Sequence, residues 1–174
     1  GIFHLVPTAR TIIDTGGQDA KAIRLDNNGM VSQFFMNDKC AAGTGRFLEV
    51  MSRVLEIDIT QMAEYDSRAT EVVNVSSTCT VFAESEVISH LSNNVPKENI
   101  IAGIHASVAS KACGLAYRTG LEDDIVMGGG VAQNAGVVRA ISRELRRPVI
   151  VAPNPQITGA LGAALFAYDE ANKH

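Results

Sequence analysis

Three strand patterns joined by two tight turns fill residues 11–36 and constrain the fold more than any other feature of the chain. Residues 11–14 and 20–25 are short apolar runs, separated by a turn with two consecutive glycines. Asp26-Asn-Asn-Gly29 is a strong hairpin signal and leads into a third predicted strand over 30–36. The pattern predicts an antiparallel meander with a glycine turn at its first corner.

The rest of the chain alternates helical and strand patterns. Apolar residues at helical spacing predict helices over residues 45–56, 60–65, 82–92, 96–117, 131–145 and 158–171. Short apolar runs predict strands over residues 72–75, 125–127 and 148–152. We expect Val87, Ile88 and Leu91 to face inward, and the small residues of the last helix to let it pack closely. This order predicts a single layered α/β domain over residues 1–174.

Composition and charge exclude several classes of function. The 174 residues are 46% hydrophobic and 20% charged, which suits one well-cored domain rather than a disordered chain. A net charge of −4 without a Lys/Arg cluster argues against nucleic acid or a membrane surface as a partner. No apolar run approaches about 18 residues and no secretion signal is present, so we expect the cytoplasm. No histidine has partners at ligand spacing, so none, His105 included, is assigned chemistry.

Two of the three cysteines stand close to predicted helix starts. Cys40 lies in Asn37-Asp-Lys-Cys-Ala-Ala-Gly-Thr-Gly-Arg46, and Cys79 ends the motif Ser76-Ser-Thr-Cys79. Free N–H groups at a helix N-terminus stabilise thiolates. Zinc and iron–sulfur clusters take four ligands, so two cysteines per chain predict a metal centre shared by two copies across a two-fold axis. Spacing alone leaves open that both are ordinary buried thiols, and Cys113 is expected in the core.

The glycine turn after the first strand has the features of an anion site. In Asp14-Thr-Gly-Gly-Gln-Asp19, the N–H groups around Gly16 and Gly17 can approach a phosphate closely. Asp14 is placed to hold a Mg²⁺-bound water, and Gln18 to orient an attacking water toward a γ-phosphate. The alternative is a plain tight hairpin. The motif is neither a Walker loop nor a dinucleotide fingerprint, because no helix follows it.

A second glycine run lies between a predicted strand and a predicted helix. Gly128, Gly129 and Gly130 follow the strand over 125–127, at the carboxyl end where α/β domains bind ligands. A flat adenine or ribose can lie against such a backbone, and the side chains of the following helical turn are placed to hydrogen-bond it: Gln133 and Asn134. A βα turn with incidental glycines is the alternative. The two glycine segments, at opposite ends of the domain, predict a phosphate end and an adenosine end of one nucleotide site.

Four motifs together resemble a known family. Residues 13–21, 37–47, 76–88 and 128–134 are similar to those of the activators of 2-hydroxyacyl-CoA dehydratases, in the BadF/BadG/BcrA/BcrD ATPase family. The resemblance runs over essentially the whole chain, and its two cysteine motifs are highly specific. It implies an actin-like, ribonuclease H-like ATPase fold, of which this chain would form the C-terminal subdomain with most of the cluster-bearing region.

The resemblance also implies a function and a set of site residues. Members are homodimers with one [4Fe–4S] cluster bridging the subunits, and Cys40 and Cys79 correspond to its ligands. The implied activity is ATP-dependent one-electron transfer to the dehydratase, with ATP or ADP and Mg²⁺ as ligands and ferredoxin or flavodoxin as electron source. The second phosphate motif of the family corresponds to Asp14, Gly16, Gly17 and Gln18. Its adenosine motif corresponds to Gly128, Gly129, Gly130, Gln133 and Asn134. Gly159 corresponds to a position that borders the nucleotide.

Two departures from the family pattern leave other functions open. Thr15 stands where the family has an aliphatic residue, and the first phosphate loop of the family, Asp-x-Gly-Ser/Thr, is absent from residues 1–174. We therefore expect the C-terminal part of a longer ATPase. One alternative is a small-molecule kinase of the same fold, which leaves Cys40 and Cys79 without a role. Another is a non-enzymatic dimerising scaffold with a structural metal.

Overall fold

The structure is a computed structural model that describes residues 1–76 and 79–173. Within them, five strands form one sheet in the order β3-β2-β1-β4-β5. Strands β1, β2 and β3 form the predicted antiparallel meander, while β4 and β5 run parallel to β1. The strand bounds are Thr11–Thr15 for β1, Ala20–Leu25 for β2, Val31–Asn37 for β3, Ile125–Gly128 for β4 and Val149–Val151 for β5.

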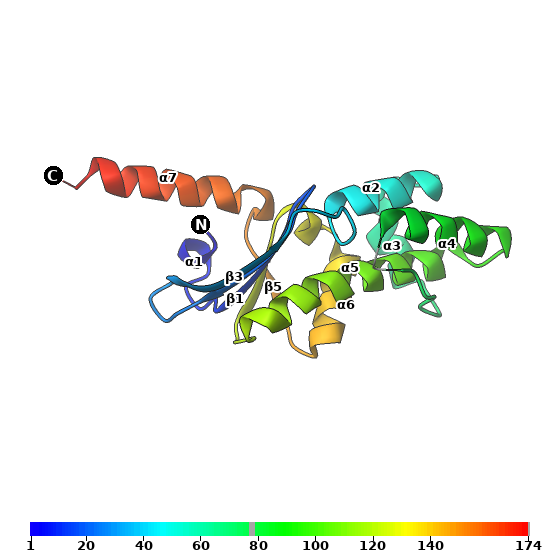
Figure 1. The fold of residues 1–174 in the computed structure, drawn as a ribbon, viewed down its shortest axis with the longest axis horizontal. Helices are drawn as coiled ribbons and strands as arrows, with labels where there is room; N and C mark the ends of the chain where they lie inside the picture. The colour runs from blue at the N-terminus through cyan, green and yellow to red at the C-terminus, as the bar shows by residue number, and fades with distance from the viewer. Residues whose placement is uncertain (77–78, 174) are drawn as a thin grey trace.

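Helices cover the sheet and extend beyond both of its ends. Figure 1 shows α5 running below the sheet, α2, α3 and α4 gathered beyond one end, and α7 projecting past the other. The helices are α1 Ile2–Leu5, α2 Gly45–Val54, α3 Met62–Ser67, α4 Thr80–Ser92, α5 Lys97–Thr119, α6 Ala135–Leu145 and α7 Thr158–Ala171. Three short 3₁₀ turns accompany them: η1 Ile59–Gln61, η2 Gly130–Gln133 and η3 Pro155–Ile157. The α/β class agrees with the prediction.

The larger hydrophobic core lies between the sheet and α5. Ile13 and Met127 from the sheet pack there with Ile104 of α5, and Cys113 is fully buried among them as expected. A smaller cluster on the opposite face of the sheet joins Ile12 to α1. Strand β1 is therefore buried on both faces, which suits the centre of the sheet.

Helix α5 is the central helix of this core. Pro96 precedes it, and Gly120 ends it in the left-handed conformation at φ 73°, as expected for a helix stopped by glycine. By length and composition alone α5 could cross a membrane, but 72% of its most apolar window is buried inside the structure. Its apolar character is therefore explained by its place in the core.

The strand predicted over 72–75 is wrong. The described backbone from residue 71 to 76 is irregular and lies along α5. The Oδ1 atom of Asn99 accepts the N–H groups of Thr70 (3.0 Å) and Glu71 (3.3 Å). A Cβ on Gly103 would lie 2.2 Å from the carbonyl oxygen of Val73, so the segment touches the bare backbone of the helix. Contacts with a helix thus replace the sheet ladder that the valine-rich sequence suggested.

Three helix predictions also need correction. Ile88 is 49% exposed although its neighbour Val87 is buried, because α4 presents only a narrow face to the core. The helix predicted over 131–145 is interrupted at Asn134, where the 3₁₀ turn η2 ends and α6 begins. Among the described residues of α7 only Thr158 is buried. Of its small residues, Gly162 does allow a close approach, because a Cβ there would lie 2.9 Å from the backbone nitrogen of Gly1.

Candidate functional site

Sheet pairing brings the two glycine segments to one edge. Asp14 of β1 is the register partner of Gly128 in β4, and these parallel strands end side by side. Gly129 has a φ of +79°, and a Cβ there would lie 2.2 Å from the carbonyl oxygen of Thr15. Only glycine lets the loops after β1 and β4 approach so closely. The two segments predicted to lie at opposite ends of the domain are therefore neighbours.

The turn after β1 is also bonded to the start of α2. The N–H of Gly45 donates to the carbonyl oxygen of Gly16 at 2.9 Å, and the N–H of Arg46 donates to that of Gly17 at 2.8 Å. The expectation that this helix start offers free N–H groups to Cys40 is therefore wrong for both residues, since the glycine turn accepts from them. The loop that carries Cys40 ends directly before Gly45 and Arg46, the two residues that donate these hydrogen bonds.

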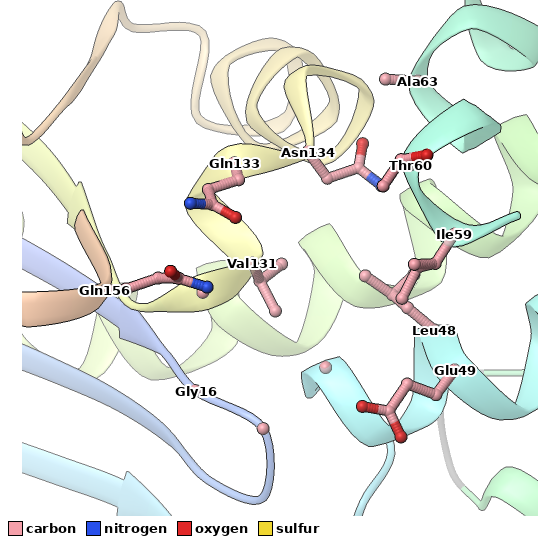
Figure 2. A pocket seen from close by; sticks show the side chains of 13 residues that line it. Gly16, Leu48, Glu49, Ile59, Thr60, Ala63, Val131, Gln133, Asn134 and Gln156 are labelled. Atoms are coloured by element: carbon pink, nitrogen blue, oxygen red, sulfur yellow. The ribbon is translucent and has the colours of Figure 1, made fainter. Parts of the chain in front are cut away.

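A cavity of about 400 Å³ opens between these segments. Figure 2 shows Gln133 and Gln156 on one side and Leu48, Glu49 and Ile59 across from them. Apolar side chains with a few polar groups and bare glycine backbone are typical of a small-molecule site, and the volume lies in the usual range. The full lining is Gly16, Gly17, Gly45, Leu48, Glu49, Ile59, Thr60, Ala63, Gly130, Val131, Gln133, Asn134 and Gln156.

A second cavity, of about 460 Å³, adjoins the first. The two share Gly16, Gly17, Gly130 and Gln156. The second cavity is the more polar of the two, because the charged side chains of Asp14, Asp19 and Lys21 line it. The rest of its separate lining consists of Gly129, Pro155, Thr158 and Gly159, of which the last two begin α7. Their shared glycine wall makes the two cavities parts of one elongated site.

Asp14 and Asp19 are the two carboxylates that line this second cavity. Burial raises the pKa of Asp14, Lys21 acts to lower it, and Asp19 raises it further. Lys21 is itself bound to Asp19, with 2.5 Å between Nζ and Oδ1. Asp14 is thus partly desolvated, and a carboxylate with a raised pKa in a cavity is typical of a functional site.

Other predicted residues take positions that differ from the expectation. Gln18 is exposed and lines neither cavity, and Gly128 lies within β4, where a Cβ would meet Ile2 at 2.8 Å. Asn134 lines the first cavity as the N-cap of α6, with its Oδ1 accepting the N–H groups of Gly136 (2.9 Å) and Val137 (3.2 Å). Asn134 is thus a helix cap as well as a cavity residue.

Both cysteines of the predicted metal centre are partly buried. Cys40 packs against the larger core, and Cys79 is the N-cap residue of α4, with no capping hydrogen bond from its side chain. Next to it, Thr80 Oγ1 is buried and has no hydrogen-bond partner among the described residues. Val81 and Phe82 follow, 65% and 63% exposed. Within residues 1–76 and 79–173, no group of three or more possible metal ligands gathers.

His105 has partners that the sequence did not reveal. It is fully buried on α5, with Nδ1 3.3 Å from Asp66 Oδ1 and Nε2 3.2 Å from Asn134 Nδ2. Spacing along the chain does not indicate these contacts, because they join α5 to α3 and to the N-cap residue of α6. The only local signal was a histidine among apolar and small residues of a predicted helix, which marks a buried polar group.

Comparisons with known proteins agree over nearly the whole chain. The sequence profile of the BadF/BadG/BcrA/BcrD ATPase family matches residues 1–167. The activator of lactoyl-CoA dehydratase from Anaerotignum propionicum is 72% identical over 173 residues, which are 99% of this chain and 67% of that relative. The chain therefore spans about two thirds of the length of this curated relative.

Solved structures agree with this match. The activator of the 2-hydroxyisocaproyl-CoA dehydratase from Clostridium difficile, with bound ADPNP, has a TM-score of 0.95 and 55% identity, covering 99% of this chain and 64% of that one. The ethanolamine utilization protein EutJ from Carboxydothermus hydrogenoformans, at 15% identity, has a TM-score of 0.54, covering 91% of this chain and 50% of that one. The latter likeness concerns the fold alone, which is that of the actin-like ATPases.

Proposed function

This chain belongs to the BadF/BadG/BcrA/BcrD ATPase family, and on that premise we propose that it acts in an ATP-dependent activator that passes single electrons to a 2-hydroxyacyl-CoA dehydratase. The relatives reported above are named as activators of such dehydratases. The chain spans about two thirds of their length, so the activity is assigned to the intact protein. Within the intact protein, residues 1–174 supply the glycine turn at Gly16 and Gly17 for the phosphates, the glycine segment at residues 128–130 for the adenosine, and the two cysteines.

In this proposal one nucleotide occupies both adjoining cavities. The phosphates of ATP or ADP lie against Gly16, Gly17 and Gly129, where bare backbone permits close approach. The adenosine lies in the less polar cavity, beside Gly130, Gln133 and Asn134. Support comes from the shared glycine wall and from the relative with bound ADPNP.

Asp14, Gln18 and Gly159 have separate roles around the phosphates. The half-buried carboxylate of Asp14 binds a water of the Mg²⁺ that accompanies ATP, and the cation keeps it ionised. Gln18, at the exposed tip of the same turn, orients the attacking water. Gly159, at the start of α7, borders the phosphates without a side chain in their way.

The cysteine pair fits half of a shared iron–sulfur site. Cys79 directly precedes the N-terminus of α4, whose dipole stabilises negative charge. Thr80 Oγ1 beside it is buried without a hydrogen-bond partner among residues 1–76 and 79–173. Exposed Val81 and Phe82 offer an apolar surface to a second copy. Cys40 and Cys79 from each of two chains would hold a [4Fe–4S] cluster, which takes up and returns one electron at a time when bound. Ferredoxin or flavodoxin is the proposed electron source.

One observation carries the link between nucleotide and electron transfer. The N–H groups of Gly45 and Arg46, which follow the Cys40 loop, donate to the carbonyl oxygens of Gly16 and Gly17 at 2.9 and 2.8 Å. A γ-phosphate that pulls on the glycine turn therefore also pulls on the start of α2 and on the Cys40 loop. Binding and hydrolysis of ATP can in this way shift Cys40 and change the exposure of the proposed cluster to the dehydratase.

Anaerobic purification of the intact protein tests this function. We expect a brown protein with about four irons per two chains. Cys40→Ser and Cys79→Ser should each remove most of the iron. Cys113→Ala, which changes a buried thiol in the core, should keep it.

Other outcomes would contradict the proposal. Full iron content in Cys40→Ser would remove that residue from the site. A colourless protein with one zinc per dimer would support the scaffold, and phosphate transfer to a small acceptor without iron would support the kinase. An iron-loaded protein that reduces its dehydratase equally well without ATP would retain the cluster but overturn the coupling.

A further inference from the structure

His105 lies where three helices meet, beside the nucleotide cavity. It projects from α5 toward Asp66 on α3 and toward Asn134 at the start of α6. A Cβ on Gly136 would lie 2.4 Å from both Nδ1 and Cε1 of its ring, so the imidazole rests on bare backbone. The ring is therefore confined to one orientation, and none of the roles assigned above uses it.

The hydrogen bonds of Asn134 define the protonation of this ring. Its Oδ1 already accepts from Gly136 and Val137, so its amide nitrogen is the atom that faces His105. An amide nitrogen only donates, and the Nε2 of His105 must then be an unprotonated acceptor. The proton of the neutral imidazole consequently lies on Nδ1. Asp66 Oδ1 lies 3.3 Å from this nitrogen, but Nδ1 makes no hydrogen bond to any described residue, so the two atoms are close without being aligned.

Asp66 links His105, through Arg139, to Ala63, a residue of α3 that lines the cavity. Burial raises the pKa of Asp66, but its contacts with His105 and Arg139 outweigh that effect and lower the pKa overall. Arg139 Nη2 lies 2.6 Å from Asp66 Oδ2 and 2.9 Å from the carbonyl oxygen of Ala63. Ala63 and Asn134 both line the cavity, Ala63 from α3 and Asn134 from the start of α6. His105 and Asp66 are thus the connection between the two.

We propose that His105 is a positioning residue for the nucleotide: it holds Asn134 and α3 at the separation that adenosine requires. This inference rests on nucleotide binding in the first cavity, as proposed above. Because Asn134 caps α6, a shift of its side chain would also move η2, which carries Gln133. A pocket held in its binding shape in advance loses less free energy on binding than one that must be ordered by the ligand.

Two variants of His105 separate positioning from simple filling of space. A glutamine places a carbonyl oxygen near the former Nε2 and keeps an acceptor for Asn134. An asparagine places its amide nearer the former Nδ1, so it keeps the contact with Asp66 and loses Asn134. We expect His105→Gln to retain ADPNP affinity within about twofold. His105→Asn should lose about tenfold, which corresponds to about 1.4 kcal/mol.

The measurement is calorimetric titration of the intact protein with ADPNP, with thermal unfolding recorded for each variant. Thr119→Val is the matched control, because Thr119 is a buried, hydrogen-bonded side chain on the same helix that lines no nucleotide cavity. It should leave the affinity unchanged even where its melting temperature falls as far as that of His105→Asn.

Each remaining outcome has a defined meaning. Equal ADPNP affinities for His105→Asn and His105→Gln, in a wild type that binds, would overturn the positioning role and leave the proposed function intact. A wild type that binds no ADPNP would overturn both. ¹⁵N spectra of the imidazole give an independent reading: a proton on Nδ1 supports the arrangement, and a proton on Nε2 refutes it.

Discussion

At the residue scale, Gly129 and Asp14 illustrate two different reasons for finding a residue at the site. Gly129 is required by the protein itself, because a Cβ would lie 2.2 Å from the carbonyl oxygen of Thr15. The sequence pointed to this glycine, but for its approach to a ligand rather than to another loop. Asp14 is the opposite case, since its partial burial raises its pKa and costs stability unless a cation is bound.

Asp14→Asn should therefore stabilise the nucleotide-free protein at neutral pH. A carboxyl group whose pKa is raised on folding favours the folded state most when protonated, and this advantage is lost as pH rises through the folded pKa. The gain from Asn should thus be full near pH 7 and shrink as pH falls toward 4. The same variant should lose at least about tenfold in Mg²⁺-ADPNP affinity, or about 1.4 kcal/mol. Urea unfolding across this pH range and calorimetry measure the two effects. Lower stability at pH 7 would show that the ionised carboxylate is already well satisfied.

At the element scale, α5 is both a core helix and a source of hydrogen bonds for other segments. Its apolar residues were recognised from their spacing, and its ends from Pro96 and Gly120. Its buried polar residues serve other parts of the chain: Asn99 binds the backbone near residue 70, and Ser107 donates to the carbonyl oxygen of Ser76 at 3.0 Å. This explains why residues 72–75 form no strand.

Asn99→Ala tests this function of α5. Asn99 is only 6% exposed, and its Oδ1 accepts from Thr70 and Glu71. Removing a buried acceptor leaves N–H groups unsatisfied, so the free energy of unfolding should fall by about 1–3 kcal/mol. Asn93→Ala is the control, because Asn93 is the exposed C-cap residue of α4 and, among the described residues, its side chain donates only to the nearby carbonyl oxygen of Ser89. It should change stability by less than about 0.5 kcal/mol. Equal effects in urea unfolding would refute the tie between α5 and this segment.

At the scale of the whole molecule, the surface beside Cys79 is apolar as well as exposed. Val81 and Phe82 are 65% and 63% exposed on the first turn of α4. In the proposed function, one copy would supply two of the four sulfur ligands of the cluster. An apolar surface next to an incomplete ligand set suits a second copy of the chain.

Phe82→Glu should therefore weaken the dimer and lower its iron content. Because Phe82 is largely exposed in one chain, the folded monomer should tolerate the change, whereas a charge buried in the interface costs several kcal/mol. Ile150→Glu on the edge strand β5 is the control, since Ile150 is also partly exposed and lies outside this surface. Sedimentation and iron analysis under anaerobic conditions measure both. A Phe82→Glu protein that stays dimeric with full iron would place the interface elsewhere.

Local patterns explain which parts of the fold and the site were predictable. The meander, α5 and the two glycine turns depend on residues close in sequence, and Gly16, Gly17 and Gly130 do line the first cavity. The opposite wall could not be predicted, because Leu48, Glu49, Ile59, Thr60 and Ala63 reach it from α2, η1 and α3. The exposure of Ile88 likewise depends on which helices α4 meets, a fact that spacing does not contain.

By itself, the sequence determined that the chain has glycine turns after two strands, cysteines beside helix starts and one long apolar helix, since each depends on short-range sterics and periodicity. Only the tertiary structure decided that the two turns share an edge, that the turn at Gly16 accepts hydrogen bonds from α2, and that His105 meets Asp66 and Asn134. The physical reason is the range of the interactions. Strand pairing and helix packing join residues far apart in the chain, and no local pattern states which partners will meet.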